Sequence, residues 1–281
     1  MSDSYRYVLL DVFTDTPLQG NQLAVFPEAP ALSATAMQRL ARELNLSETV
    51  FVRPAENGGD ARIRIFTPAS EMPFAGHPTL GSAVVIGFER GREQLTLETG
   101  AGAVAVVLSL DSRSVASGWM RQPIPTWEPY EHQAELLRAL GVERSELPVE
   151  AYVNGPRHVY VQLADTRSVA ALSPEMRALS ELGETGFSCF SGSGSIWKTR
   201  VFAPGLGVAE DPATGSSAGP LAVHLARHGR VRFGEEIEIQ QGSEIGRPSR
   251  LLARAIGSAR EIERVEVGGS AVIVARGEFL L

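Results

Sequence analysis

Alternating apolar and polar residues dominate the first 110 residues of the chain. In the run Arg-Ile-Arg-Ile at residues 62–65 every second side chain is apolar, which is the period of a strand with one buried face. The pattern predicts β-strands over residues 5–13, 23–26, 49–52, 61–66, 95–98 and 103–110. We therefore expect a fold rich in short strands that each bury one face.

Helical spacing is less frequent. Apolar residues at positions 37, 40, 41 and 44 follow the spacing i, i+3, i+4 and i+7, which predicts an amphipathic helix over residues 34–44 with Ser33 as its N-cap. Leucines at positions 136, 137 and 140 precede Gly141. They predict a second helix that ends at this glycine.

The two halves of the chain share an internal repeat. Arg-Ile-Phe-Thr-Pro at residues 64–68 is matched by Arg-Val-Phe-Ala-Pro at residues 200–204. Glu-Met-Pro-Phe-Ala-Gly-His at residues 71–77 is matched by Glu-Asp-Pro-Ala-Thr-Gly-Ser at residues 210–216, and a weaker match joins residues 20–26 to residues 154–160. A repeat at this scale predicts two copies of one structural unit.

In each copy a strand is followed by a turn that contains glycine and then by a helical segment, over residues 78–88 and 217–228. The start of a helix has free backbone N–H groups and the positive end of the helix dipole, so each turn is a candidate site for a carboxylate. If the two copies face each other, both helix ends point into one cleft, which favours a small anionic substrate. The structural alternative is that each glycine only allows the chain to turn and the helix to pack.

Composition and charge narrow the class of partner. The chain has 281 residues, of which 43% are hydrophobic and 21% are charged, enough for one large domain or two small ones. Its net charge is −7 and it has no dense run of Lys or Arg, which argues against a nucleic-acid or membrane partner. The first apolar run, residues 7–10, is too short for a signal peptide or a membrane span. We expect a soluble, cytoplasmic protein that acts on a small molecule.

Cys189 is the only cysteine, which excludes an intrachain disulfide, a zinc site built from several cysteines and a racemase that uses two thiols. Because phenylalanines lie at positions 187 and 190, we expect a buried, unreactive thiol.

Glu48 lies between the first predicted helix and an apolar strand. If its neighbours bury it, desolvation raises its pKa toward the range useful for moving protons to and from carbon. The alternative interpretation of the same sequence is a charge at the end of a strand that faces solvent.

His77 and Ser216 occupy matched positions of the repeat, at the starts of the two helices. A histidine there can bind a carboxylate or carry a proton, and Asp211 lies in the second turn together with Ser216. All three residues are equally suited to be ordinary helix caps. Their matched places in the repeat favour a functional role.

Two further motifs bear on cofactors. His224 and His228 have the i, i+4 spacing of helical zinc ligands, but the glutamate of the protease motif is missing. We predict no metal site and interpret both as histidines at the C-terminal end of a helix, facing its dipole. The serine- and glycine-rich residues 191–195 lack the lysine and the spacing of a phosphate-binding loop, so we predict a flexible loop there and no nucleotide cofactor.

These residues together carry a family resemblance that spans nearly the whole chain. The chain resembles the PhzF-like family of the diaminopimelate-epimerase superfamily, and within it the phenazine-biosynthesis members. The broader match rests on residues 11–13, 20–21, 45–48, 73–78 and 210–216, and the narrower one on residues 122–127, 154–159, 219–229 and 244–249.

The resemblance implies an α+β fold with two pseudo-symmetric lobes, each a mostly antiparallel sheet rolled around a central helix. We place the N-terminal lobe at residues 1–120, joined by the last strand over residues 271–281, and the C-terminal lobe at residues 121–270. The active site is expected in the cleft between the lobes, and the family is commonly homodimeric.

The resemblance also implies residue roles. Glu48 matches the family's acid/base glutamate, His77 the histidine of the first turn, and Asp211 and Ser216 the residues of the second turn. The matched motifs further imply substrate contacts from four residues, namely Gly76, Gly215, Asn21 and Ser47.

The activity implied is a cofactor-independent isomerisation of trans-2,3-dihydro-3-hydroxyanthranilate, in which acid/base transfer moves a proton from C3 to C1 and yields an aminoketone precursor of phenazines. Two alternatives stay open, because a fold does not fix a substrate. One is a PhzF-like isomerase or epimerase of another small amino or hydroxy acid. The other is a non-catalytic binding protein of the same fold.

Overall fold

The structure is a computed structural model that describes residues 4–29, 32–112 and 114–281. Strands outnumber helices in it. The strands are β1 (Ser4–Val12), β2 (Asn21–Phe26), β3 (Glu48–Arg53), β4 (Ala61–Phe66), β5 (Glu71–Met72), β6 (Gln94–Thr99), β7 (Gly102–Ser109), β8 (Val115–Gln122), β9 (Thr126–Pro129), β10 (Glu150–Val153), β11 (Arg157–Gln162), β12 (Gly186–Ser193), β13 (Ile196–Ala203), β14 (Val208–Asp211), β15 (Ile237–Gln241), β16 (Ser249–Gly257) and β17 (Ile262–Leu280). The helices are α1 (Ala34–Leu44), α2 (Gly76–Arg90), α3 (Gln133–Leu140), α4 (Thr166–Ala170), α5 (Met176–Glu181) and α6 (Gly215–Arg227), with short 3-10 turns at Pro204–Leu206 and Ser243–Ile245.

The periodicity predictions for the first half are confirmed. The six predicted strands are β1 to β4, β6 and β7, with ends that differ by at most two residues. Helix α1 spans residues 34–44 as predicted, and the Ser33 hydroxyl accepts a hydrogen bond from the Ala36 N–H at 3.2 Å. Helix α3 ends before Gly141, which has a φ of 70° that suits glycine.

The prediction of a flexible loop over residues 191–195 is wrong for residues 191–193, while residues 194–195 form a turn. Residues 191–193 end β12 and pair with β13 in an antiparallel hairpin, in which Ser191 lies opposite Lys198 and Ser193 opposite Ile196. Cross-strand pairing with the directly following strand overrides the local preference of serine and glycine for loops.

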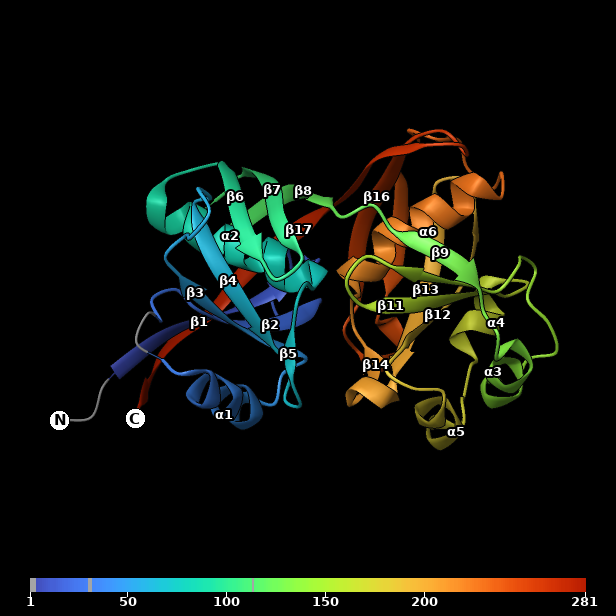
Figure 1. Ribbon diagram of the computed structural model, residues 1–281, viewed down its shortest axis with the longest axis horizontal. Helices are drawn as coiled ribbons and strands as arrows, with labels where there is room; N and C mark the ends of the chain where they lie inside the picture. Colours follow the sequence, from blue (N-terminus) through green and yellow to red (C-terminus); the bar gives the residue numbers. More distant parts are fainter. Residues whose placement is uncertain (1–3, 30–31, 113) are drawn as a thin grey trace. The chain divides into compact units, whose positions relative to one another are not determined.

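The chain divides into two compact units. Unit 1 comprises Met1–Arg121 and Gly268–Leu281, and unit 2 comprises Gln122–Val267. The part of β17 after Val267 belongs to unit 1, where it pairs antiparallel with β1, from Ser4 opposite Leu280 to Val12 opposite Ala271. Figure 1 shows β17 in red beside the blue β1.

In unit 1 the sheet surrounds α2. This helix contacts β1, β2, β3, β4, β6 and β7, and every residue from Gly76 to Gly87 is buried. The shorter α1 packs on β3 and β4, where Met37, Leu40 and Ala41 lie in one cluster with Phe26 and Phe51. Helix α2 is buried over these residues because strands surround it.

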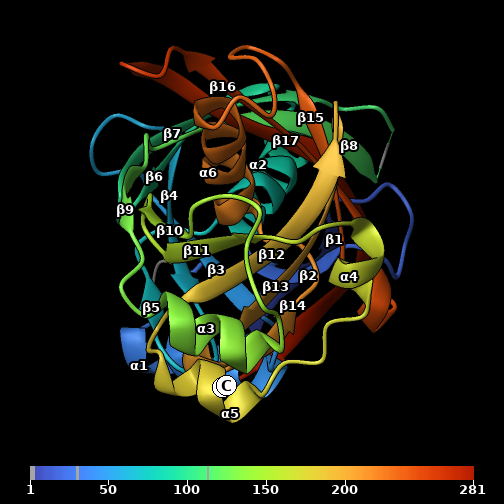
Figure 2. The same ribbon diagram turned by 90° about the vertical axis from the view of Figure 1, so that its right-hand side faces the viewer.

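In unit 2 the central helix is α6, which is buried from Gly215 to Ala226. It contacts β16, and the His224 ring packs against the rings of Tyr152, Tyr160 and Phe190 from β10, β11 and β12. Helices α3 and α5 contact each other at the periphery of this unit (Figure 2).

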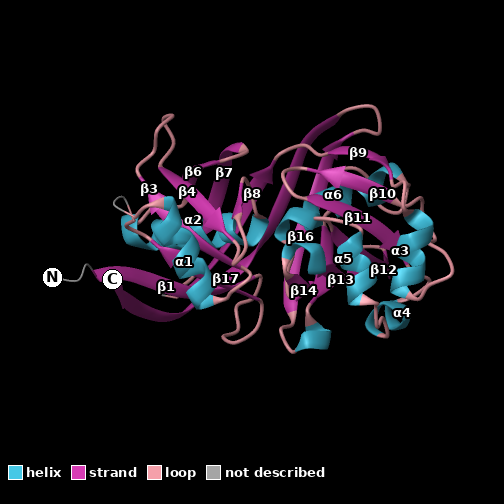
Figure 3. Cartoon of the chain, turned by 60° about the horizontal axis from the view of Figure 1, so that its bottom comes forward, coloured by secondary structure: helices cyan, strands magenta, loops and turns pink. Residues whose placement is uncertain are grey.

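The two units repeat the same order of strand pairing. In unit 1 the pairs β1–β2, β2–β3, β3–β4, β4–β5, β4–β6 and β6–β7 are antiparallel, parallel, antiparallel, antiparallel, parallel and antiparallel. The same sequence of orientations occurs in unit 2 for β10–β11, β11–β12, β12–β13, β13–β14, β13–β15 and β15–β16. Most pairs are antiparallel, and the helices are few and separate from the strands (Figure 3), so the chain is α+β.

Among the described residues no helix is long and apolar enough to span a membrane.

Candidate functional site

In unit 1 two predicted residues, Glu48 and His77, come together. Glu48 is the first residue of β3, beside Leu23 of the parallel strand β2, and His77 is the second residue of α2. Their side chains approach to 3.4 Å between Glu48 Oε2 and His77 Nε2. The Glu48 side chain is 14% exposed, so the interpretation of a charge that faces solvent is wrong, because the start of α2 covers this strand end.

His77 is a neutral side chain. Burial lowers its pKa to about 3, while a hydrogen bond with the backbone of Gln22 acts in the opposite direction. Asn21 Nδ2 lies 3.3 Å from His77 Nδ1. A neutral imidazole beside a carboxylate can donate or accept one hydrogen bond without adding charge to the site.

The other predicted contacts of unit 1 surround this pair. Gly76 begins α2, whose N-cap residue Ala75 makes no side-chain capping bond, and the helix therefore presents backbone N–H groups at its start. Asn21 is buried at the start of β2, whereas Ser47 is half-buried next to Glu48.

In unit 2 Asp211 ends β14 and is half-buried. Its Oδ2 accepts a hydrogen bond from the Thr214 hydroxyl at 2.6 Å. Gln241 holds this turn from the neighbouring strand, because its amide Nε2 donates to the Asp211 carbonyl at 2.7 Å and to Thr214 Oγ1 at 2.9 Å. The Asp211 carboxylate is therefore bonded to a Thr214 hydroxyl that Gln241 in turn holds in place.

Helix α6 begins at Gly215, two residues before the start predicted from the repeat, and Ser216 is its second residue. The Gly215 carbonyl accepts a hydrogen bond from Gln122 Nε2 at 2.8 Å, and Ser216 Oγ lies 3.0 Å from Nε2 of the buried His158. Sequence reasoning missed His158 and Gln122 as neighbours of this turn. Both lie within the segments that resemble the phenazine-biosynthesis members, and that overlap was the available signal.

His224 and His228 lie near the C-terminal end of α6, as predicted, but they face a carboxylate as well as the helix dipole. Their ring nitrogens lie 3.2 and 3.1 Å from Glu150 Oε2. The same oxygen accepts from Arg227 at 2.8 Å and from the Tyr152 hydroxyl at 2.9 Å. These partners lower the pKa of Glu150 despite its burial. Among the described residues, Glu150, His224 and His228 are the one cluster that could hold a metal ion. The Arg227 side chain already places a positive charge against the Glu150 carboxylate of this cluster.

Cys189 is fully buried, and desolvation raises its pKa to about 12. The prediction of a buried thiol is confirmed.

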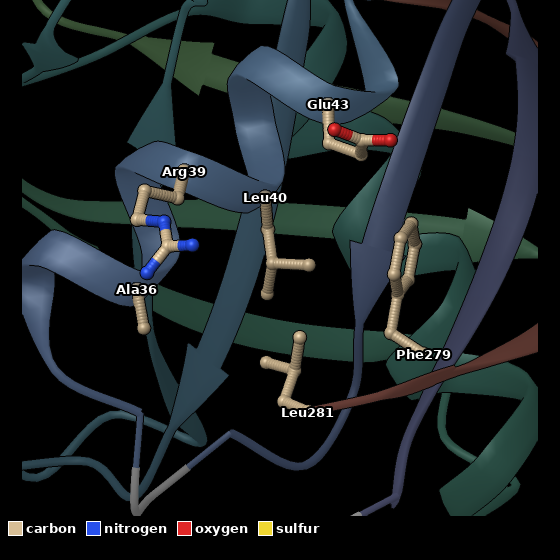
Figure 4. A pocket seen from close by; sticks show the side chains of 6 residues that line it. All are labelled: Ala36, Arg39, Leu40, Glu43, Phe279 and Leu281. Atoms are coloured by element: carbon tan, nitrogen blue, oxygen red, sulfur yellow. The ribbon is translucent and has the colours of Figure 1, made fainter.

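A separate concavity of unit 1 lies away from these residues. It is lined by Ala36, Arg39, Leu40, Glu43, Phe279 and Leu281 (Figure 4). Apolar side chains form most of its wall, with one cation and one anion, and none of the predicted site residues lines it. It offers no acid/base pair.

Comparison with known proteins identifies the family. Residues 10–277 match the family described as phenazine biosynthesis-like protein. The chain belongs to this family. Among curated relatives, the trans-2,3-dihydro-3-hydroxyanthranilate isomerase of Pseudomonas chlororaphis is 52% identical and covers 99% of this chain and 100% of its own. The isomerase of the same name from Pseudomonas aeruginosa is 50% identical with the same coverage.

A solved structure supports the fold. A predicted epimerase from Pseudomonas aeruginosa superimposes with a TM-score of 0.85 at 31% identity and covers 99% of both chains. The prediction of an epimerase-like fold of the PhzF type is thus confirmed at the level of overall architecture.

Proposed function

We propose that this protein is a trans-2,3-dihydro-3-hydroxyanthranilate isomerase. The observation that carries the substrate assignment is the identity of 50–52% to curated isomerases of that name over nearly the full length of both chains. The observation that carries the chemistry is the partly buried Glu48 carboxylate beside neutral His77, since a positioned carboxylate is the group required to move a proton between carbons.

In the proposed reaction the Glu48 carboxylate removes the proton from C3. The electrons of that bond form a C3–C4 double bond, the remaining diene shifts, and C1 takes up the proton that the protonated Glu48 now carries. The product is an enol at C3, which loses its hydroxyl proton and gains one at C4 to become the aminoketone. No oxidant, reductant or cofactor is needed to balance these steps.

The two glycine turns have the complementary role in this proposal. Backbone N–H groups at Gly76 and at Gly215, together with the Ser216 hydroxyl, bind the substrate carboxylate, because helix starts favour anions. Asp211 binds the substrate amine, and Asn21 and Ser47 line the site around the acid/base pair. The proposal requires that the groups of both units act on one substrate molecule, as expected for two pseudo-symmetric lobes with a shared cleft.

We further propose a homodimer, in line with the family resemblance. Sedimentation velocity of the purified protein at micromolar concentration tests this point, and a species of one chain mass would contradict it.

The activity test follows the reaction of metal-free protein with trans-2,3-dihydro-3-hydroxyanthranilate by NMR in deuterium oxide, with Glu48→Gln alongside. We expect rapid loss of substrate and movement of the proton between C3 and C1, both abolished in the variant. Glu43→Gln is the matched control, because Glu43 is an exposed glutamate on the preceding helix.

Two outcomes would contradict the proposal. Full activity of Glu48→Gln would remove this residue as the base. A folded protein that leaves this substrate unchanged but exchanges the α-proton of another small amino or hydroxy acid would move the chain to the other enzymatic interpretation.

A further inference from the structure

One short segment of unit 2 contacts Ser216 at two points. Asn154 Nδ2 donates to the Ser216 carbonyl at 2.9 Å, and His158 Nε2 lies 3.0 Å from Ser216 Oγ. Asn154 is the first residue of the turn between β10 and β11, and His158 is the second residue of β11. The second residue of α6 is therefore held at its backbone and at its side chain by one segment.

The backbone contact has a local cause in α6. Pro220 lies inside this helix, and proline lacks the N–H that would bond to the carbonyl four residues earlier. That carbonyl belongs to Ser216, and the Asn154 amide supplies the missing donor. Pro78 in α2 needs no such replacement, because it lies in the first turn, where N–H groups have no helical partner.

Pro220 does not explain the contact between the His158 ring and the Ser216 hydroxyl. The surroundings of His158 determine which of the two groups donates in this hydrogen bond. The ring is 3% exposed, and its Nδ1 has no hydrogen-bond partner among the described residues. Nδ1 lies against the backbone of Gly186 on the neighbouring strand, where a Cβ would be only 2.6 Å away. Burial lowers the pKa of His158 to about 4, which leaves the ring neutral at neutral pH.

A neutral imidazole has one N–H and one bare nitrogen. With the proton on Nδ1, a buried donor would be left unpaired, which is costly. With the proton on Nε2, the ring N–H donates a hydrogen bond to Ser216 Oγ. The hydrogen bond made by one ring nitrogen thus selects the tautomer.

We infer that His158 is a positioning residue that donates from Nε2 to Ser216 Oγ and so leaves the serine hydroxyl proton available for the substrate carboxylate. If the direction were reversed, Ser216 would give its proton to His158 and turn a lone pair toward an anion, which would repel it. The identity of the bound carboxylate rests on the proposed function, whereas the direction of the hydrogen bond does not.

The first test needs no substrate. In ¹⁵N-labelled protein, the NMR spectrum of the histidine rings is recorded between pH 8 and pH 5. We expect His158 to show a protonated Nε2 and a bare Nδ1 throughout this range, with His158→Gln used to assign its signals. A proton on Nδ1 would overturn the inference.

The second test separates positioning from a purely structural role. His158→Leu removes the donor, and we expect KM to rise roughly 10- to 100-fold with a much smaller change in kcat, the size expected for losing one hydrogen bond to a charged group. His158→Gln keeps an N–H at a similar distance from the backbone and should recover most of the affinity. In the Ser216→Ala background, His158→Leu should have no further effect on KM.

Two results would overturn the inference. One is an effect of His158→Leu on KM that persists in full when Ser216 is already alanine. The other is a loss of kcat with unchanged KM in a variant that melts like the wild type. If the protein turns over no trans-2,3-dihydro-3-hydroxyanthranilate while His158 carries its proton on Nε2, the proposed function fails and the direction of the hydrogen bond stands.

Discussion

The turn at Gly76-His77 and the turn at Gly215-Ser216 begin equivalent helices, yet their chemistry differs. In unit 1 the histidine lies on the helix and faces Glu48 on β3 at 3.4 Å. In unit 2 the histidine lies on strand β11 and faces the serine on the helix at 3.0 Å.

Strand register shows which residues correspond. Glu48 pairs with a residue of β2 and lies three residues before Phe51, which is opposite Arg64. In unit 2 the same place is Gly186, three residues before Cys189, which is opposite Arg200. One copy of the repeat thus has a carboxylate where the other has no side chain.

The two copies of a duplicated fold can therefore perform two different tasks. The carboxylate makes unit 1 the candidate for proton transfer. The glycine makes room for His158 and leaves unit 2 with hydrogen-bond donors for an anion. The following predictions test this division.

The largest expected effect is on turnover. Glu48→Gln should lower kcat by about 100- to 10,000-fold, because a positioned acid/base group contributes on that scale. Ser216→Ala should instead raise KM by roughly 10- to 100-fold, because it removes one hydrogen bond to a charged group. Steady-state kinetics of both variants checks this, and equal losses of kcat in the two would contradict the division of tasks.

The next largest effect is on stability. It compares two ion pairs that occupy matched positions of the repeat but differ in burial. Arg200 and Glu210 are each 9% exposed, and Arg200 also donates to the Leu172 carbonyl at 2.6 Å. The equivalent pair Arg64 and Glu71 is 21% and 42% exposed.

We expect Arg200→Met to lower the free energy of unfolding by about 3–5 kcal/mol, because it leaves a buried carboxylate unpaired. Arg64→Met should cost about 0–1 kcal/mol, because solvent screens the exposed pair. Urea unfolding measures both values. Similar losses would show that burial does not distinguish the two copies.

A smaller effect concerns the replacement of a helical hydrogen bond in α6. Asn154→Ala should cost about 1–3 kcal/mol of stability, because the buried Ser216 carbonyl loses its donor. In a Pro220→Ala background the helix regains its own N–H, and the loss from Asn154→Ala should shrink. A double-mutant cycle by thermal or urea unfolding checks this, and additive losses would be inconsistent with it.

The smallest effect is on the pH dependence of stability. Burial lowers the pKa of His77 to about 3 and that of His158 to about 4, from an ordinary value of 6.5. The unfolded chain therefore binds these protons below pH 6.5 while the folded chain does not, so stability falls as the pH drops from 6.5 toward those values.

Each histidine contributes up to about 1.4 kcal/mol per pH unit in this window. His158→Gln should reduce the slope of unfolding free energy between pH 6 and pH 5, because it removes one buried neutral imidazole. An unaltered slope in His158→Gln would mean that this ring is not buried in its neutral form.

Much of the fold could be predicted from local pattern. The strands of the first half, α1 with its Ser33 cap and the end of α3 at Gly141 follow from periodicity and capping, which depend on neighbours in sequence. The internal repeat predicted that a helix follows each of the turns at Gly76 and Gly215, because similar sequences adopt similar local structures, and both helices begin two residues earlier than predicted. It also placed His77, Asp211 and Ser216 among the candidates, whereas Glu48 was chosen from its apolar neighbours in the sequence.

Only the tertiary structure decided how these side chains are paired. Burial of Glu48 depends on α2 covering the end of β3, and His224 and His228 meet Glu150 from a distant strand. The hydrogen bond between His158 and Ser216 depends on the parallel pairing of β11 with β12, which brings His158 beside Gly186. Such contacts join residues far apart in the chain, and local sequence carries no record of which distant partner desolvates or bonds a given group.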